Sequence, residues 1–214
     1  MRRQWSAGAV LMHEGDRSEH VVVIEHGRVK VTSAAATGKQ ALLAIRGPGD
    51  LLGELSAIDG KERSATVTAL SQVTATLVPG SAFRDLLIGD GQIAFALLRV
   101  VVDRLREADV QRLEFGAYNV TERIARLLVD YARRYGEQGD DGVIITLPLS
   151  QEELAHAAGA SREAVSKALK RLRDLGVLRT GRRRIELLRP DLLADIVKGL
   201  PSVHLDADAP GHPR

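Results

Sequence analysis

The sequence has no cysteine, and aromatic residues make up only 3% of it. Without thiols the chain can form no disulfide, thiolate zinc site, iron–sulfur cluster or cysteine nucleophile, which fits a reducing cytoplasm. Its longest apolar run, Ile93 to Val102, is interrupted by Arg99 and is too short to span a bilayer. The first residues lack the apolar segment of a signal peptide. We therefore expect a cytoplasmic protein that has no membrane partner.

Signatures of catalysis and of metal binding are also missing. The six histidines show no metal-ligand spacing, and neither G-x-S-x-G nor H-E-x-x-H occurs. Gly89 to Ala94 fits G-x-G-x-x-A, but a dinucleotide site needs a preceding strand, and these residues follow a helical pattern. We expect no enzyme, no catalytic or metal-binding residues and no covalent cofactor.

The N-terminal part of the sequence has the pattern of short strands. From Ala9 to Val78, apolar and β-branched residues alternate with polar ones, and turn residues such as Gly47-Pro48-Gly49-Asp50 separate the runs. Regularly spaced short strands of this kind predict an antiparallel barrel or roll, which we assign to residues 1–90. Ser81 is expected to cap a short helix that Gly89 ends.

A long helical pattern follows, assigned to residues 91–118. Its apolar residues form a narrow seam at spacings near heptad positions a and d, interrupted by Arg112; the seam comprises Leu98, Val101, Leu105, Ala108 and Phe115. Ordinary core packing is the alternative interpretation, but so narrow a seam on so long a helix favours self-association. We expect a parallel homodimer.

The last third reads as a winged helix-turn-helix over residues 119–190. Asn119 and Glu122 form a capping signature that starts a new helix and predicts a hinge, and Ser150 and Glu153 form a second one. Residues 136–142 read as a polar loop and residues 143–147 as a strand. Helices over 150–158 and 161–175 flank a glycine turn, and a hairpin over 178–187 follows. Residues 191–214 are expected to hold a helix remnant and a disordered tail. The fold class is α+β.

Charge is concentrated in this region. Residues 161–184 contain nine basic and two acidic residues, a local net charge of +7, although the whole chain carries only +2. A solvated helix face is the alternative, but a capped helix pair with a basic hairpin favours double-stranded DNA. The candidate DNA contacts are Ser161, Arg162, Glu163, Ser166, Lys167 and Lys170 on the second helix, with Arg182, Arg183 and Arg184 on the hairpin. Arginine suits guanine and glutamate suits cytosine, although Arg162 and Glu163 could instead form a surface ion pair.

The segment from Gly159 to Leu169 matches the pattern G-x-S-R-E-x-V-x-[RK]-x-L and resembles the recognition helix of the Crp/Fnr family, the relatives of catabolite activator protein. The resemblance extends over nearly the whole chain. It implies a homodimeric transcription regulator in which Arg162, Glu163 and Lys167 read bases in a pseudo-palindromic operator, with RNA polymerase as a further partner.

A second segment resembles the family's cyclic-nucleotide cassette. Gly53-Glu54-Leu55 and Arg63-Ser64-Ala65 combine a glycine, a carboxylate, a planar cation and a hydroxyl, which suit a phosphate and a ribose. An ordinary turn with an exposed ion pair is the alternative. The resemblance implies that Glu54 holds the 2′-OH and that Arg63 and Ser64 hold the phosphate of a small-molecule effector, with cyclic AMP as the first candidate and cyclic GMP as the second.

The helix that follows departs from the family pattern. Cyclic-AMP members carry Thr followed by Ser or Asn where this chain has Ala108-Asp109, whereas Arg104 matches another position on the base side. The resemblance therefore implies intact phosphate and ribose recognition with altered base recognition and weak coupling to DNA. Two alternatives stay open. The chain could be a constitutive DNA binder with an unresponsive β domain, or a nucleotide-binding module of another effector, which the basic helix-turn-helix argues against.

Overall fold

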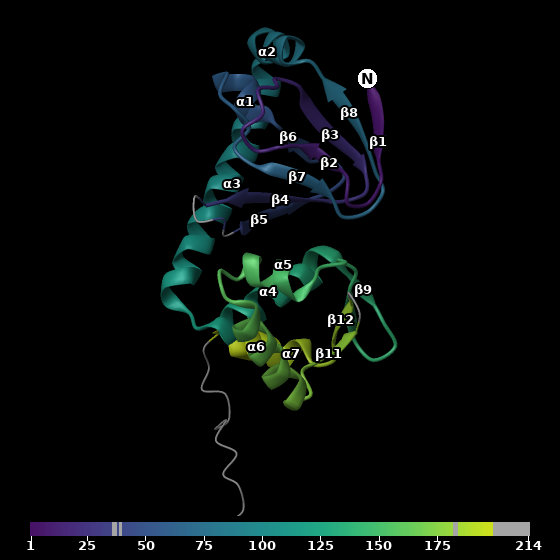
Figure 1. Ribbon diagram of the computed structural model, residues 1–214, viewed down its shortest axis with the longest axis vertical. Coiled ribbons are helices and arrows are strands. Elements are labelled where there is room, and N and C mark those ends of the chain that lie inside the picture. Colours follow the sequence, from purple (N-terminus) through teal and green to yellow (C-terminus); the bar gives the residue numbers. More distant parts are fainter. Residues whose placement is uncertain (36–37, 39, 182–183, 199–214) are drawn as a thin grey trace, which may run out of the picture. The chain divides into compact units, whose positions relative to one another are not determined.

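The computed structural model describes residues 1–35, 38, 40–181 and 184–198 (Figure 1). It contains two compact units, of which the first ends at Ala117 and the second begins at Tyr118. The predicted fold class is confirmed, because antiparallel sheets, a long helix and a helix-turn-helix with a hairpin all occur.

The first unit is built on two four-stranded antiparallel sheets. One has the order β1 (Arg2–Trp5), β8 (Val73–Val78), β3 (Val21–His26) and β6 (Leu51–Leu52). The other has the order β2 (Val10–Met12), β7 (Thr66–Ala69), β4 (Val29–Ala34) and β5 (Gln40–Arg46). The strand pattern over Ala9 to Val78 predicted strands in this region, but it missed β1, which pairs with β8 from Arg2 to Trp5.

Apolar side chains from both sheets form the core of this roll. Val22 and Ile24 of one sheet pack in the same buried cluster as Val29 and Val67 of the other. The alternation along β7 shows why. Val67 and Ala69 are buried, whereas Thr66 and Thr68 are only half-buried. Successive side chains of a strand point to opposite faces, so one face of the sheet meets the core and the other is polar.

Three helices belong to the first unit: α1 (Glu54–Asp59), which the sequence pattern did not predict, α2 (Gly80–Gly89) and α3 (Gly91–Ala117). The expected cap of α2 was wrong. Pro79 is the N-cap residue, and no side chain caps this helix. The first residue of the helix is closely packed, because a Cβ atom at Gly80 would collide with the carbonyl of Glu19. Ser81 is exposed.

Helix α3 presents its seam to solvent. None of its 27 residues, all of which the structure describes, is buried. Leu98, Leu105 and Phe115 have exposed fractions of 54%, 60% and 44%. In one copy of the chain these apolar side chains are therefore uncovered, and dimerisation through them stays a prediction.

The second unit combines four helices with a small sheet. The helices are α4 (Val120–Tyr135), α5 (Gln151–Ala157), α6 (Arg162–Asp174) and α7 (Pro190–Lys198). The antiparallel sheet has the order β11 (Leu178–Gly181), β12 (Arg184–Leu187), β10 (Val143–Ile145) and β9 (Gly136–Gln138). Both predicted capping boxes are confirmed, at Asn119 before α4 and at Ser150 before α5.

The expected polar loop over residues 136–142 was wrong in part, because its first three residues form β9 and pair with β10. A tight turn joins the two strands, since the Gly139 amide donates to the Gly142 carbonyl. The residues of β9 show no apolar alternation, so the sequence pattern does not indicate this strand. The expected disordered tail from Pro201 onward lies outside the described residues.

Candidate functional site

The predicted nucleotide cassette begins at a tight turn between β6 and α1. Gly53 has a φ of 80°, a backbone conformation that favours glycine. A Cβ atom at this position would also collide with Nη1 of Arg63. Glycine is therefore needed at position 53 for two reasons: it adopts this backbone conformation, and it leaves the space that the guanidinium group occupies.

Arg63 is a buried cation held by neutral groups. Its exposed fraction is 3%. Its Nε donates to the Ser18 hydroxyl at 2.9 Å, its Nη1 donates to the Gly53 carbonyl at 2.9 Å, and its Nη2 donates to the His20 carbonyl. Burial lowers the pKa of the guanidinium group, and the negative charges of Glu54 and Asp16 oppose that shift. Arg63 thus joins the loop before β3 to the turn before α1.

Glu54 connects the cassette to α3. This carboxylate is 4% exposed and accepts a hydrogen bond from Nη1 of Arg104 at 2.8 Å. The other terminal nitrogen of Arg104 donates to the Leu51 carbonyl at 2.6 Å. One turn further along α3, Glu107 pairs with Arg46 of β5 at 3.2 Å. Two ion pairs therefore link one face of α3 to the roll.

The structure brings together four of the predicted nucleotide contacts, Gly53, Glu54, Arg63 and Arg104. Ser64 is exposed beside Arg63, Ala65 is half-buried, and Leu55 is exposed on α1. Ala108 and Asp109 are both exposed on α3, and Asp109 lies 3.9 Å from Arg112. They contribute no bond to the Glu54–Arg104 pair.

Sequence reasoning missed Ser18, His20, Arg46 and Glu107. Ser18 and His20 contact a side chain more than 40 positions away, and neither belongs to a local motif. Arg46 and Glu107 are separated by 61 positions. Only the spacing of Glu107 from Arg104, three residues along a predicted helix, could have indicated that the two share a face.

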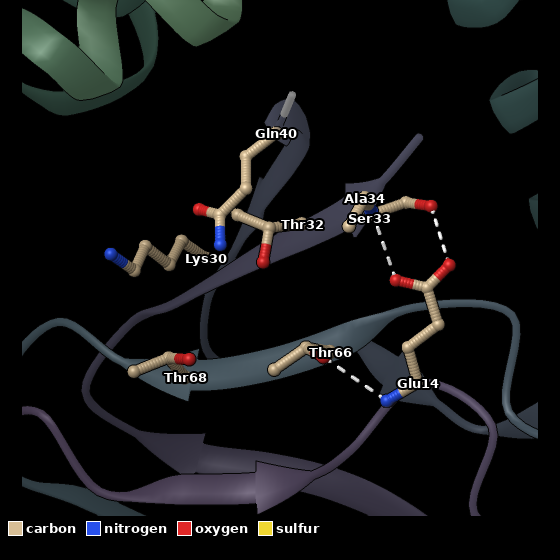
Figure 2. A pocket seen from close by; sticks show the side chains of 8 residues that line it. All are labelled: Glu14, Lys30, Thr32, Ser33, Ala34, Gln40, Thr66 and Thr68. Atoms are coloured by element: carbon tan, nitrogen blue, oxygen red, sulfur yellow. Dashed lines mark hydrogen bonds between the residues drawn. The ribbon is translucent and has the colours of Figure 1, made fainter. Parts of the chain in front are cut away.

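A small polar cavity of about 200 Å³ lies elsewhere, on the outer face of β4, β5 and β7 (Figure 2). Lys30, Thr32, Thr66 and Thr68 line it, and they alternate along their strands with core residues. The Glu14 carboxylate accepts hydrogen bonds from the Ser33 hydroxyl and the Ala34 amide (Figure 2). Among the described residues that line this cavity there is none of the predicted nucleotide contacts.

The predicted recognition helix, α6, has one buried and one exposed face. Val165, Ala168, Leu169 and Leu172 are buried against the rest of the unit. The predicted base and phosphate contacts on the helix are all exposed: Ser161, Arg162, Glu163, Ser166, Lys167 and Lys170. The buried residues recur at spacings of three and four positions, which place them on one face of an amphipathic helix and leave the polar residues on the other.

Two of these exposed residues also shape the start of α6. The Ser161 hydroxyl accepts a hydrogen bond from the Ala164 amide at 3.2 Å, so Ser161 is the N-cap residue. The pKa of Glu163 is lowered, chiefly by a hydrogen bond from its own backbone amide and by the Ser161 hydroxyl. The positive charges of Arg162 and Lys167 lower it further. Glu163 is therefore held as an ionised acceptor at the N-terminus of the helix.

Arg123, which sequence reasoning missed, fixes the helix-turn-helix to the start of its own unit. Its Nε donates to the Ala158 carbonyl at the end of α5, and its Nη1 donates to the Tyr118 carbonyl, both at 2.8 Å. The next turn of α4 carries Arg126, which stacks on the Tyr118 ring at 3.7 Å from the centroid and donates to the Val197 carbonyl in α7. Two arginines of α4 thus tie Tyr118 to the end of α5 and to α7.

The hairpin of β11 and β12 is the predicted wing. Arg182 and Arg183 lie outside the described residues. Arg184 and Arg179 lie 3.7 Å and 3.6 Å from the carboxylate of Glu186, which is buried. The wing therefore has an internal counterion, and a phosphate group would compete with Glu186 for Arg184.

Two further observations concern membrane-spanning helices and metal sites. None of the helices in the described part of the chain is long and apolar enough to cross a membrane. Among the same residues, no group of three histidine, aspartate or glutamate side chains is placed to hold a metal ion.

Comparison with known proteins finds a family model for each of the two units. Residues 2–90 match the model of the cyclic nucleotide-binding domain, and residues 122–196 match that of the Crp-like helix-turn-helix domain. The chain is 35% identical over 162 residues to the CRP-like cAMP-activated global transcriptional regulator of Mycobacterium tuberculosis, covering 76% of this chain and 72% of that one. It is 30% identical over 199 residues to the Cyclic AMP receptor protein of Thermus thermophilus, covering 93% and 89%. A solved CRP-family regulator from Thermus thermophilus superposes with a TM-score of 0.80 at 25% identity, covering 92% of this chain and 96% of that one.

Proposed function

Because the chain belongs to the Crp/Fnr family of DNA-binding transcription regulators, which are not enzymes, we propose that it binds a pseudo-palindromic operator as a homodimer and that a cyclic nucleotide modulates this binding. The exposed face of α6 is the observation that carries the DNA part of the proposal. Arg162 and Lys167 there face solvent in the N-terminal half of a helix whose opposite face is buried, and Lys170 extends the exposed basic face. N-terminal residues of a recognition helix reach base edges in the major groove.

The same geometry supports the proposed homodimer. A pseudo-palindrome has two equivalent half-sites, so two copies of α6 related by a two-fold axis are needed to read it. The uncovered seam on α3 supplies a surface for that pairing. By family resemblance we also propose RNA polymerase as a partner and half-sites with a GTGA-like core.

The buried Arg63 and Glu54 support a cyclic-nucleotide effector. Arg63 is a cation away from solvent whose hydrogen-bond acceptors are two carbonyls and one hydroxyl, and a phosphate would supply an anion in direct contact with it. Two relatives are named for cyclic AMP, which makes it the first candidate, with cyclic GMP as the second. The exposed Ala108 and Asp109 favour weak coupling of this effector to DNA binding.

A fluorescence anisotropy titration tests both parts of the proposal. The probe is a labelled duplex that carries two GTGA-containing half-sites about 34 Å apart, one helical turn. We expect tight, salt-dependent binding that a scrambled duplex of equal length does not reproduce. Calorimetry with cyclic AMP and cyclic GMP then tests the effector. A chain that binds the operator but neither nucleotide would be a constitutive DNA binder, and one that binds nucleotide but no DNA would be a regulatory module of another effector.

A further inference from the structure

The loop before β3 carries a residue that acts on the cassette from outside it. Residues 13–20 run alongside Arg63. The Arg63 amide donates to the Asp16 carbonyl at 3.0 Å, and the Gly15 amide donates to the Arg63 carbonyl at 2.9 Å. Two side-chain bonds of Arg63, to the Ser18 hydroxyl and the His20 carbonyl, reach the same loop. Main chain and side chain of Arg63 are thus both fixed to this loop.

These contacts determine which parts of the guanidinium group remain for a ligand. An arginine side chain has five N–H donors in one plane. In the described part of the chain, the Nε donor is taken by Ser18, one Nη1 donor by Gly53 and one Nη2 donor by His20. One N–H on each terminal nitrogen is left, which is the number that a bidentate bond to an oxyanion uses.

Ser18 differs from the other two partners in one respect. The Gly53 and His20 carbonyls belong to the backbone, so their positions are set by the fold. The Ser18 hydroxyl is the only one of the three acceptors that a side chain supplies, and it holds Nε, the atom whose position sets the rotation of the guanidinium plane. A buried guanidinium group that lacks this acceptor keeps two partners, both on its terminal nitrogens, and loses the bond that holds Nε in place.

We infer that Ser18 is a positioning residue for an oxyanion at Arg63, because its hydroxyl fixes the plane in which the two remaining N–H groups meet a phosphate. The inference rests on the proposed nucleotide site and adds a residue outside the cassette to it. It predicts that Ser18 governs how well the site distinguishes the two exocyclic oxygens of a cyclic phosphate, since a fixed plane assigns each oxygen to its own N–H group.

The test uses the full chain and the two phosphorothioate diastereomers of cyclic AMP, which place a sulfur at one or the other exocyclic position. Calorimetry gives the affinities for cyclic AMP and for both diastereomers. We expect Ser18→Ala to weaken cyclic AMP binding about tenfold, as the loss of one bond to a charged group implies, and to reduce the discrimination between diastereomers to less than about twofold. Ser18→Thr keeps the hydroxyl and should restore the discrimination. Ser81→Ala, at an exposed serine on α2, is the matched control.

The ratio of the two affinities does not depend on the fraction of folded protein, because both ligands bind the same population. A variant that is merely less stable therefore leaves the ratio unchanged. Wild-type affinities in Ser18→Ala, or an equal loss for both diastereomers, would overturn the inference while leaving the cyclic-nucleotide function standing.

If the wild-type chain binds no cyclic nucleotide, inorganic phosphate separates the two proposals. Thermal unfolding is followed by the fluorescence of Trp5, the single tryptophan, which is buried in the roll. Stabilisation of the wild type by phosphate that Ser18→Ala abolishes would support the positioning role and reject the cyclic-nucleotide effector. The absence of any stabilisation would reject both.

Discussion

At the scale of single residues, Arg162 and Lys170 lie on the same exposed face of α6 but should contribute differently. Arg162 is at the N-terminal end, where a guanidinium group can pair with guanine O6 and N7. We expect Arg162→Ala to cost about 1–3 kcal/mol of operator binding and to relax the preference at one G·C pair. Lys170→Ala, the comparison variant, should weaken all sequences alike and reduce the salt slope by about one. Unchanged sequence preference in Arg162→Ala would assign base reading to another residue.

His20 should make the first unit less stable in mild acid. Burial lowers the pKa of its imidazole below 6.5, and the positive charges of Arg63 and Arg3 lower it further. Between the lowered pKa and 6.5 the unfolded chain binds more protons than the folded one, so the free energy of unfolding falls as the pH drops through that window. Urea titrations followed by Trp5 fluorescence between about pH 7.5 and 5 should show this slope. His20→Gln should reduce it, whereas His13→Gln, at an exposed position, should not.

At the scale of secondary-structure elements, the capping box of α4 is a separate source of stability for the second unit. The Asn119 side chain accepts from the Glu122 amide at 3.1 Å, and the Glu122 carboxylate accepts from the Asn119 amide at 2.9 Å. Asn119→Ala should destabilise this unit by about 0.5–2 kcal/mol. Circular dichroism should report the loss in urea, while the Trp5 transition of the first unit should stay in place. A shift of both transitions would contradict a local role.

The seam of α3 gives a second prediction at this scale. Leu105 and Leu113 are 60% and 70% exposed in one copy of the chain, but only Leu105 lies on the predicted seam. Light scattering at micromolar concentration should give about twice 23.2 kDa for the wild type. Leu105→Glu should give a folded monomer, because it places two like charges in the interface, and Leu113→Glu should remain a dimer. A dimeric Leu105→Glu chain would place the interface elsewhere.

The elements differ in how far the sequence predicts them. The α6 helix and the wing were predictable because capping residues, a glycine turn and a regular apolar spacing lie close together in the chain. The strand β9 and the start of α2 were not, since backbone pairing and the close approach of Gly80 to Glu19 leave no apolar pattern. In the candidate site, Gly53, Glu54 and Arg63 share a local motif. Ser18 and Arg46 contribute through contacts with distant segments, which no spacing rule describes.

At the scale of the whole molecule, the effector can change operator affinity only through its different affinities for two states of the dimer. Ala108 and Asp109 offer no hydroxyl on the face of α3 beyond Arg104. We expect saturating cyclic AMP to raise the operator affinity of the wild type less than about fivefold, the lower end of typical coupling. Ala108→Thr should increase that ratio in the anisotropy titration. Ala117→Thr, at an exposed position on the same helix, is the control.

A large enhancement in the wild type that Ala108→Thr leaves unchanged would show that coupling does not depend on this position. Equal operator affinities with and without nucleotide in both chains, combined with measurable nucleotide binding, would show that the roll binds its effector without acting on the DNA-reading unit.

The first residues of the second unit are held by hydrogen bonds within that unit. Asn119 and Glu122 start α4, and Arg123 joins Tyr118 to the end of α5. All of these bonds connect residues on the C-terminal side of Ala117, so they are kept when a different sequence precedes Tyr118. In evolutionary terms, recombination at this point transfers a DNA-reading unit intact. A lineage can then exchange the signal that it senses while its operators stay the same.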